Sequence, residues 1–384
     1  MLTRHPTLPN GDLMSVHDID PWLWRRFSMI TSGHADAVAV DVTEVVESGP
    51  AAELPTDESA LDHTTRRTMI QYAEAVDSTS LIVLVNGSVA IEWYPPGRTR
   101  ETMSGSQSMH KSLLPFLVLG AIDAGLLPGL DSPIAPWMPE WADDPRGDIT
   151  IEELMRMSSG LRVAAFTMNP LSWDFAWLFS GDTAGMLRHV RQASGPNQEF
   201  AYNNINSHAL GMILSRATGV RYATWLRDRL WAPAGAGPAQ VWLDSPGGQA
   251  STSCCLQSTA YGWARFGELI GNRGEIAGER VVPAEWVDSV IAADPRWPWY
   301  GRQIWLADGL EHFGDSSEVG RLAAAEPFDA RGVVIAQGFG GQRVYVAPQE
   351  RVVVVRMGPA NGTPDFTNRW DNTRLLNMAT RGLT

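Results

Sequence analysis

The chain has 384 residues, 44% of them hydrophobic and 19% charged, which is the composition of a globular protein with one large or two small domains. A net charge of −13 argues against nucleic acid or an anionic membrane as a partner. No apolar run is long enough to span a bilayer, and the polar stretch from Met1 to Asp20 carries no secretion signal, so the sequence predicts a cytoplasmic protein.

The first elements are expected after an irregular N-terminal segment. Residues 1–60 are rich in Pro, Asp and Ser and are predicted to wrap the surface, and residues 61–76 are predicted to form a helix. Two apolar, β-branched runs at 80–85 and 88–94 leave Asn86-Gly87 between them, a strong signal for a β-hairpin. A mostly apolar helix is expected over 109–126, preceded by a flexible polar lead-in at 104–107 and bent at Pro115.

Helices are expected to dominate the middle of the chain and strands to return at its end. The predicted helices cover 151–158, 206–218, 258–270, 283–292 and 369–381, and the predicted strands cover 332–337, 342–346 and 351–357. Strands at both chain ends imply an α/β fold whose sheet is assembled from the two ends. We therefore expect an α/β domain formed by 61–125 and 236–384, and a helical domain over 126–235.

The two cysteines, Cys254 and Cys255, are adjacent in the sequence. Adjacent residues cannot form an ordinary unstrained disulfide with each other, and two thiols without a disulfide framework fit a reducing compartment. The sequence therefore predicts two small buried thiols.

Lys111 is the only lysine, and the other 29 of the 30 basic residues are arginine. Near neutral pH a buried lysine can give up its proton and an arginine cannot, so a single retained lysine indicates a chemical role. Ser108 lies three positions earlier and would share a helix face with Lys111, which predicts a serine nucleophile and its base. The alternative is a chance Ser-x-x-Lys in which Ser108 is only a helix N-cap. His110 would face away, either behind the site or exposed.

A second motif, Tyr202-x-Asn204, stands just before the helix predicted at 206–218. A phenol near an ammonium group has a lowered pKa and can relay a proton to the serine or to a leaving group. The alternative is that Asn204 or Asn206 caps the helix while Tyr202 packs on its start.

A third motif is the glycine-rich stretch 337–342, Gln-Gly-Phe-Gly-Gly-Gln. Glycines within a strand pattern mark a close backbone approach, here expected to be to a substrate carbonyl. A backbone N–H from this edge, together with that of Ser108, would form an oxyanion hole. The alternative is a glycine bulge that only turns the sheet.

These three motifs, in this order and at this wide spacing, resemble the serine hydrolases related to class C β-lactamases and penicillin-binding proteins. Within that group the chain looks most like the family VIII carboxylesterases and the 6-aminohexanoate-dimer hydrolases. The stretches that support the resemblance are 158–161, 258–267, 282–287 and 338–342. The resemblance implies a β-lactamase-like sandwich, with a mainly antiparallel sheet flanked by helices and an inserted all-helical domain.

The resemblance also implies roles for individual residues. Ser108 would be the acylated nucleophile, Lys111 its base and Tyr202 the proton relay. Asn204 would help to hold the substrate, and the N–H of Phe339, between Gly338 and Gly340, would complete the oxyanion hole. The family's lactamases carry Lys-Thr-Gly on this strand, whereas this chain has Ala336-Gln337-Gly338. The cation that would hold a β-lactam carboxylate is therefore missing.

The sequence thus predicts a hydrolase that cleaves an ester or amide of a small-molecule substrate through an acyl-enzyme. No zinc-binding His-Glu-x-x-His, Cys/His metal cluster or phosphate-binding loop is present, so no cofactor is expected. A β-lactamase or D-alanyl peptidase is the alternative with the same chemistry, and a binding protein that has lost turnover is the alternative of another class. The oligomeric state stays open.

Overall fold

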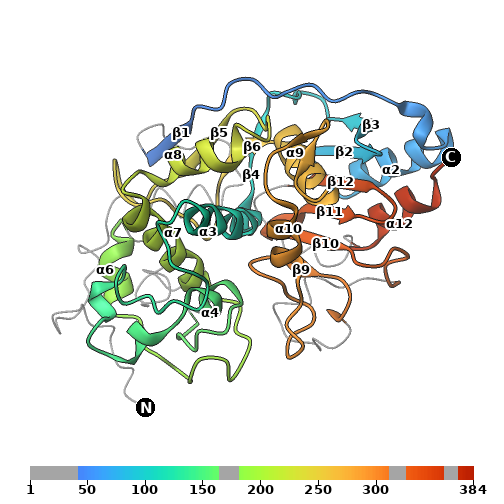
Figure 1. Cartoon of the computed structure of the whole chain (residues 1–384). Coiled ribbons are helices and arrows are strands. Elements are labelled where there is room, and N and C mark those ends of the chain that lie inside the picture. The colour runs from blue at the N-terminus through green and yellow to red at the C-terminus, as the bar shows by residue number, and fades with distance from the viewer. Residues whose placement is uncertain (1–41, 164–180, 311–325, 359–370) are drawn as a thin grey trace, which may run out of the picture.

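The computed structural model of the chain describes residues 42–163, 181–310, 326–358 and 371–384. Its centre is a six-stranded antiparallel sheet in the order β3-β2-β12-β11-β10-β9. These strands are β2 (Ser80–Val85), β3 (Ser88–Trp93), β9 (Trp305–Leu306), β10 (Val334–Gly338), β11 (Gln342–Ala347) and β12 (Val352–Met357). Because β12 pairs with β2 along its whole length, the sheet joins both ends of the chain, as predicted (Figure 1). Asn86 and Gly87 both have positive φ, as a tight hairpin turn requires.

Both faces of the sheet are covered. On one face Val353 and Val355 of β12 pack into the core that contains α9 (Ala260–Gly271). On the other face Val352 and Val354 pack with α2 (His63–Ala75) and α12 (Arg374–Arg381). Burial of both faces explains why β12 begins with four consecutive valines rather than an alternating pattern. The result is a mixed α/β fold with antiparallel sheets and flanking helices, as predicted.

A second, four-stranded sheet was not predicted. Its strands follow the order β1-β5-β6-β4, with β1 at Thr43–Val46, β4 at Met103–Gly105, β5 at Ala239–Trp242 and β6 at Gln257–Thr259. Three expectations were therefore wrong: residues 1–60 contain a strand, the polar lead-in at 104–107 begins as one, and the helix expected at 258 starts only at Ala260. These strands have three or four residues, too few to show a periodic pattern, and they exist because distant segments pair with them. Residues 1–41 lie outside the described part.

The stretch from 126 to 235 forms helices and loops wherever the structure describes it, and residues 164–180 lie outside that part. Its regular helices are α4 (Ile151–Met155), α6 (Thr183–Arg188), α7 (Asn204–Thr218), α8 (Tyr222–Leu226) and a π-helical turn at Arg227–Trp231. They gather with α3 (Leu114–Asp123) to one side of the six-stranded sheet (Figure 1). Gly219 ends α7 in the left-handed conformation, which glycine adopts readily. The domain boundaries given above remain a prediction.

The helix expected over 109–126 divides into two elements. A 3₁₀-helix, η4, covers Gln107–Leu113 and α3 follows it, with Pro115 in the first turn of α3. The N–H of Leu114 donates to the carbonyl of Lys111, so the missing N–H of Pro115 leaves that carbonyl satisfied. The predicted bend is therefore a boundary between two helices.

The last two predicted helices are slightly shorter than expected. α10 covers Ala284–Ile291, and α12 begins at Arg374 rather than at 369, while residues 369 and 370 lie outside the described part. Within the described ranges, no helix has the length and apolarity that crossing a membrane would require.

Candidate active site

Ser108 and Lys111 lie together on η4. The Nζ atom of Lys111 donates to Oγ of Ser108 at 3.0 Å and also donates to the backbone carbonyl of Ser253. In a 3₁₀-helix the side chains at i and i+3 eclipse each other, so this element serves the pair as well as the predicted α-helix would. The Lys111 side chain is buried, with 1% of its surface exposed, whereas Ser108 is half-buried. The arrangement allows a proton to pass from the hydroxyl to an amine that water hardly reaches.

The residues before the serine are held in an unusual backbone conformation. Gln107 has a φ of 49°, in the left-handed region that non-glycine residues seldom adopt. Two backbone hydrogen bonds fix the turn to the loop 251–256: Ser106 N–H donates to the Leu256 carbonyl at 2.8 Å, and Cys255 N–H donates to the Gln107 carbonyl at 3.1 Å. The position of Ser108 is therefore set by a loop that is distant in sequence.

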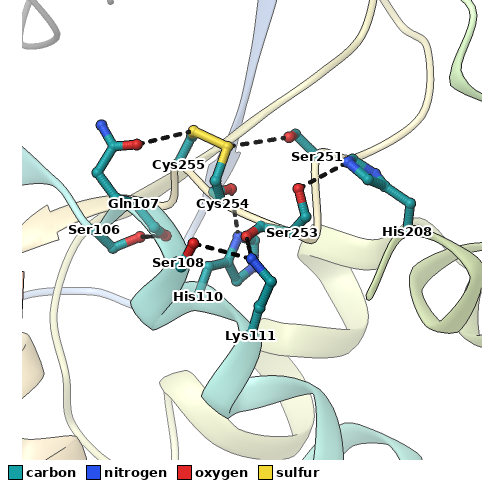
Figure 2. Close-up of a disulfide and its surroundings, with 10 residues drawn as sticks. All are labelled: Ser106, Gln107, Ser108, His110, Lys111, His208, Ser251, Ser253, Cys254 and Cys255. Atoms are coloured by element: carbon teal, nitrogen blue, oxygen red, sulfur yellow. Dashed lines mark hydrogen bonds between the residues drawn. A yellow bond between two sulfur atoms is a disulfide. The ribbon is translucent and has the colours of Figure 1, made fainter. Parts of the chain in front are cut away.

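Cys254 and Cys255, within that loop, form a disulfide with each other (Figure 2). The prediction of two free thiols was wrong. It assumed an ordinary backbone, whereas Cys255 has a φ of 74°. The disulfide directly follows Ser253, whose carbonyl holds Lys111, so it is part of the support of the lysine.

His110 is fully buried on the other side of the same turn. Its Nδ1 lies 2.9 Å from the Cys254 carbonyl, which can only accept, so Nδ1 carries the proton and Nε2 accepts from the Tyr222 hydroxyl at 2.9 Å. Burial, with a smaller contribution from the neighbouring Lys111, lowers the pKa of His110 to about 4. A neutral His110 therefore anchors the loop from behind the site, which was one of the two expected positions.

Tyr202 reaches the site from the segment before α7. Its ring centroid lies 5.1 Å from Nζ of Lys111, so the structure brings the phenol ring, the amine and the serine together. The residue that caps α7 is Asn203, which accepts from the N–H of Ile205 at 3.0 Å. The alternative in which Asn204 or Asn206 caps this helix was therefore wrong. Asn204 is the half-buried first residue of α7, and its role in holding a substrate remains a prediction.

The start of α7 is itself fixed by the stretch 158–161. The Ser159 hydroxyl donates to Oδ1 of Asn206 at 2.6 Å, and Nδ2 of Asn203 donates to the Leu161 carbonyl at 3.1 Å. At the other side of the helix, Nε2 of His208 lies 2.8 Å from the Ser253 hydroxyl (Figure 2). α7 therefore connects the tyrosine motif to the loop that holds Lys111.

Aromatic side chains that the sequence did not single out surround Tyr202. Its ring centroid lies 5.4 Å from that of Trp305 and 6.3 Å from that of Tyr300. Phe200 contacts the same rings and those of Trp297 and Trp299. Burial raises the pKa of Tyr300, and the neighbouring Tyr202 adds to this effect. The density of Trp and Tyr between 297 and 305 was the only sign of this cluster in the sequence.

The glycine-rich stretch packs against the nucleophile turn. A Cβ atom added to Gly338 would overlap the Ser106 carbonyl oxygen and would lie 3.0 Å from Cβ of Gln107. The register between β10 and β11 runs without a shift from Val334 to Gly338, so the alternative of a glycine bulge was wrong. The close approach that this glycine permits is to the Ser108 turn. A 3₁₀-turn at Phe339–Gly341 joins the two strands, and Gly340 has a φ of 74°. Donation by the Phe339 N–H to an oxyanion remains a prediction.

Among the residues that the structure describes, no three His, Cys, Asp or Glu side chains gather closely enough to hold a metal ion.

The sequence matches the family described as Beta-lactamase over residues 65–378, which is most of the chain. The chain belongs to the beta-lactamase family. This confirms the resemblance that the motifs indicated, and it makes the protein a hydrolase of the serine type. The chain is 26% identical over 302 residues to the 6-aminohexanoate-dimer hydrolase of Paenarthrobacter ureafaciens, covering 75% of this chain and 74% of that protein.

Solved structures with low sequence identity share the fold. A protein from Bacillus anthracis, provisionally named a 6-aminohexanoate-dimer hydrolase, matches with a TM-score of 0.72 at 19% identity and covers 96% of this chain and 98% of its own. EstCE1, described as a hydrolase with promiscuous acyltransferase activity, matches with a TM-score of 0.62 at 14% identity, covering 85% and 98%. A penicillin-binding protein from Bacillus halodurans matches with a TM-score of 0.57 at 13% identity, covering 76% and 95%.

Proposed function

We propose that the protein cleaves a carboxylic ester or a linear amide through an acyl-enzyme on Ser108. The observation that carries the proposal is the 3.0 Å contact between the Ser108 hydroxyl and the buried amine of Lys111. A general base has to lie within hydrogen-bond reach of the proton that it removes, and this amine does.

The Ser253 carbonyl gives the amine its orientation. A neutral amine has two N–H donors and one lone pair, and the carbonyl can accept only from an N–H. With one N–H held in this way, the lone pair can turn to the Ser108 hydroxyl and take its proton. Oγ then attacks the substrate carbonyl carbon, and the N–H groups of Ser108 and Phe339 stabilise the negative charge on the oxygen.

Tyr202 completes the proposed cycle. Its phenol, beside Lys111, would pass a proton to the leaving group as the tetrahedral intermediate collapses. Water activated by the same groups would then release the acyl group and regenerate Ser108. This chemistry uses only side chains and backbone of the chain itself, and it suits a small-molecule substrate; the predicted cytoplasmic location rests on the sequence alone, since the disulfide removes the argument from free thiols.

The preference for esters or linear amides over β-lactams rests on one position. Ala336, buried on β10, stands where the family's lactamases carry the strand lysine. The names of two similar proteins, a 6-aminohexanoate-dimer hydrolase and a hydrolase with acyltransferase activity, agree with this choice. A β-lactamase or D-alanyl peptidase is the second candidate, because the Ser108 and Lys111 pair would serve it equally well.

A substrate panel tests the proposal. p-Nitrophenyl esters of increasing chain length, short linear amides and nitrocefin are compared with wild type and Ser108→Ala, and a fluorophosphonate label is located by mass spectrometry. We expect the esters or amides to be cleaved much faster than nitrocefin, with the label on Ser108 and both lost in the alanine variant. Nitrocefin turnover equal to the best ester would favour the lactamase. If the protein neither turned over any substrate nor took up the label, a binding protein would be favoured.

A further inference from the structure

Two arginine side chains lie buried against the turn between β10 and β11. Arg343 is 1% exposed and Arg356 is fully buried. A guanidinium group is rarely buried without strong hydrogen bonds, because it must replace the water that it loses. Neither arginine belongs to the motifs that identify the family.

The two guanidinium groups hold different peptides of the turn. Nη1 of Arg343 donates to the Gly338 carbonyl at 2.8 Å and to the Gln342 carbonyl at 2.9 Å. Nη1 of Arg356 donates instead to the carbonyls of Gly340 and Gly341, at 2.9 and 3.1 Å. Arg343 therefore acts on the two ends of the turn and Arg356 on its middle.

The carbonyl that Arg343 contacts belongs to the peptide that bears the Phe339 N–H. The Gly338 C=O and the Phe339 N–H are opposite ends of one trans peptide unit, joined by amide resonance. A charged donor on the oxygen draws electron density away from the nitrogen, so the N–H becomes a stronger donor on the other side. The same bond also fixes the plane of the peptide and hence the direction of the N–H.

We propose that Arg343 is a positioning residue that aligns and polarises the Gly338–Phe339 peptide, so that the Phe339 N–H stabilises the oxyanion more strongly. This inference rests on the proposed function, because it assigns the oxyanion to that N–H. It gives this buried cation a role that requires no contact with the substrate.

The surroundings of the two arginines support an electrostatic effect. Burial lowers the pKa of Arg356 to about 9, and the charge of Arg343 is the second cause. The two cations therefore sense each other in a region of low dielectric constant. Of the two, only Arg343 donates to the Gly338 carbonyl, so its charge is the one that acts directly on the Gly338–Phe339 peptide. Ala336 offers no such cation on the strand itself.

The test replaces Arg343 by methionine, which has a similar length and no charge. The parameters kcat and KM are measured for a p-nitrophenyl ester and for its thionoester, whose sulfur accepts hydrogen bonds weakly and gains little from an oxyanion hole. Removing a whole oxyanion donor costs roughly 100- to 1,000-fold in kcat, so weakening one should cost about tenfold. We expect this tenfold loss for the ester, little change in KM, and a clearly smaller loss for the thionoester.

Arg356→Met is the matched control. It removes an equal charge and a similar volume from beside the same turn, but its partners in the turn are the carbonyls of Gly340 and Gly341, and it also donates to the Val76 carbonyl and the Ser78 hydroxyl. The ratio of ester to thionoester turnover should stay near the wild-type value in this variant. Equal losses for both substrates in Arg343→Met, or the same change of ratio in both variants, would overturn the proposal.

Asn372→Asp provides a second route if the methionine variant does not fold. Oδ1 of Asn372 accepts from Nε of Arg343 at 2.9 Å, so a carboxylate of the same shape would neutralise the guanidinium while its bond to Gly338 persists. The ester to thionoester ratio should fall in the same direction by a smaller factor, and an unchanged ratio would overturn the proposal. A wild-type protein that neither turns over esters nor accepts the label at Ser108 would overturn the proposed function as well.

Discussion

Replacing Gly338 by alanine tests whether β10 must touch the nucleophile turn. Gly338 has φ −130° and ψ 155°, an extended conformation that alanine adopts freely, so the backbone itself opposes nothing. The added Cβ would overlap the Ser106 carbonyl oxygen and lie 2.9 Å from Cβ of Gln342 and 3.0 Å from Cβ of Gln107. Since these are backbone or first side-chain atoms, the strand and the turn must separate.

The size of the effect follows from that separation. Forcing a methyl group into a packed contact of this kind costs about 1–3 kcal/mol of stability. Ser108 lies two residues after Ser106, so the shift moves the nucleophile relative to the Phe339 N–H. A displacement of roughly 1 Å between reacting groups can reduce the rate about 100-fold. We therefore expect kcat to fall by about two orders of magnitude and the melting temperature by a few degrees.

The assay compares kcat on the best p-nitrophenyl ester, the rate of fluorophosphonate labelling and the melting temperature. Gly129→Ala is the matched control, because a Cβ added there has no atom within 4 Å and its φ is not in the left-handed region. It should leave all three measurements near wild type. If Gly338→Ala kept kcat within about threefold of wild type, the packing of β10 on the Ser108 turn would not control the geometry of catalysis.

Three further predictions concern the lysine, the buried histidine and the disulfide. Lys111→Arg keeps the charge but removes the base, so kcat should fall at least about 100-fold. Tyr202→Phe should cause a similar loss. If the arginine variant turned over substrate at nearly the wild-type rate, Lys111 would act only as a fixed positive charge and not as a base. The pKa of His110 is about 4 when folded and 6.5 ordinarily. The unfolded chain therefore binds the proton first, and the free energy of unfolding should decrease as the pH falls from 6.5 towards 4. In urea titrations, a His110→Gln variant should lack this pH-dependent part of the free energy of unfolding. An identical pH dependence in both proteins would contradict a buried, neutral His110. Reducing the bond between Cys254 and Cys255 with a dithiol should lower kcat severalfold, because the adjoining Ser253 carbonyl loosens, yet barely alter the melting temperature, because a link between neighbours constrains little of the unfolded chain. If turnover stayed unchanged although both thiols could be titrated, the disulfide would not be needed to hold the active site.

All strands of the large sheet except the two-residue β9 could be predicted, because their signals are local. Asn86-Gly87 defines a hairpin by its own conformational preference, and the apolar run of β12 is long enough to identify a buried strand. The small sheet lacks such signals. Its strands are short and partly polar, and β1 and β4 become strands only when β5 and β6 arrive from more than a hundred residues away.

Some residues of the candidate site could likewise be predicted from the sequence, and others could not. Ser108 and Lys111 could be identified because their chemistry depends on side-chain type and spacing, and a single lysine is conspicuous among arginines. Ser253 acts through its backbone carbonyl, which every residue type possesses, so nothing in the sequence marks it. Arg343 looks like any other arginine until its burial and its partner are known. The disulfide was missed because the backbone conformation of Cys255 cannot be read from residue types.

The position of β12 has a consequence for how the protein is made. This strand lies between β2 and β11, so the hairpin β2–β3 keeps an open edge until Val352–Met357, more than 250 residues later, has left the ribosome. β2 is an uninterrupted apolar strand, and an exposed edge of that kind readily pairs with other chains. A prematurely terminated product ending before Val352 would therefore lack both the strand that closes the sheet and the protection against aggregation that it provides. Synthesis of this enzyme should depend on chaperones that shield β2 during elongation more than on those that act after release.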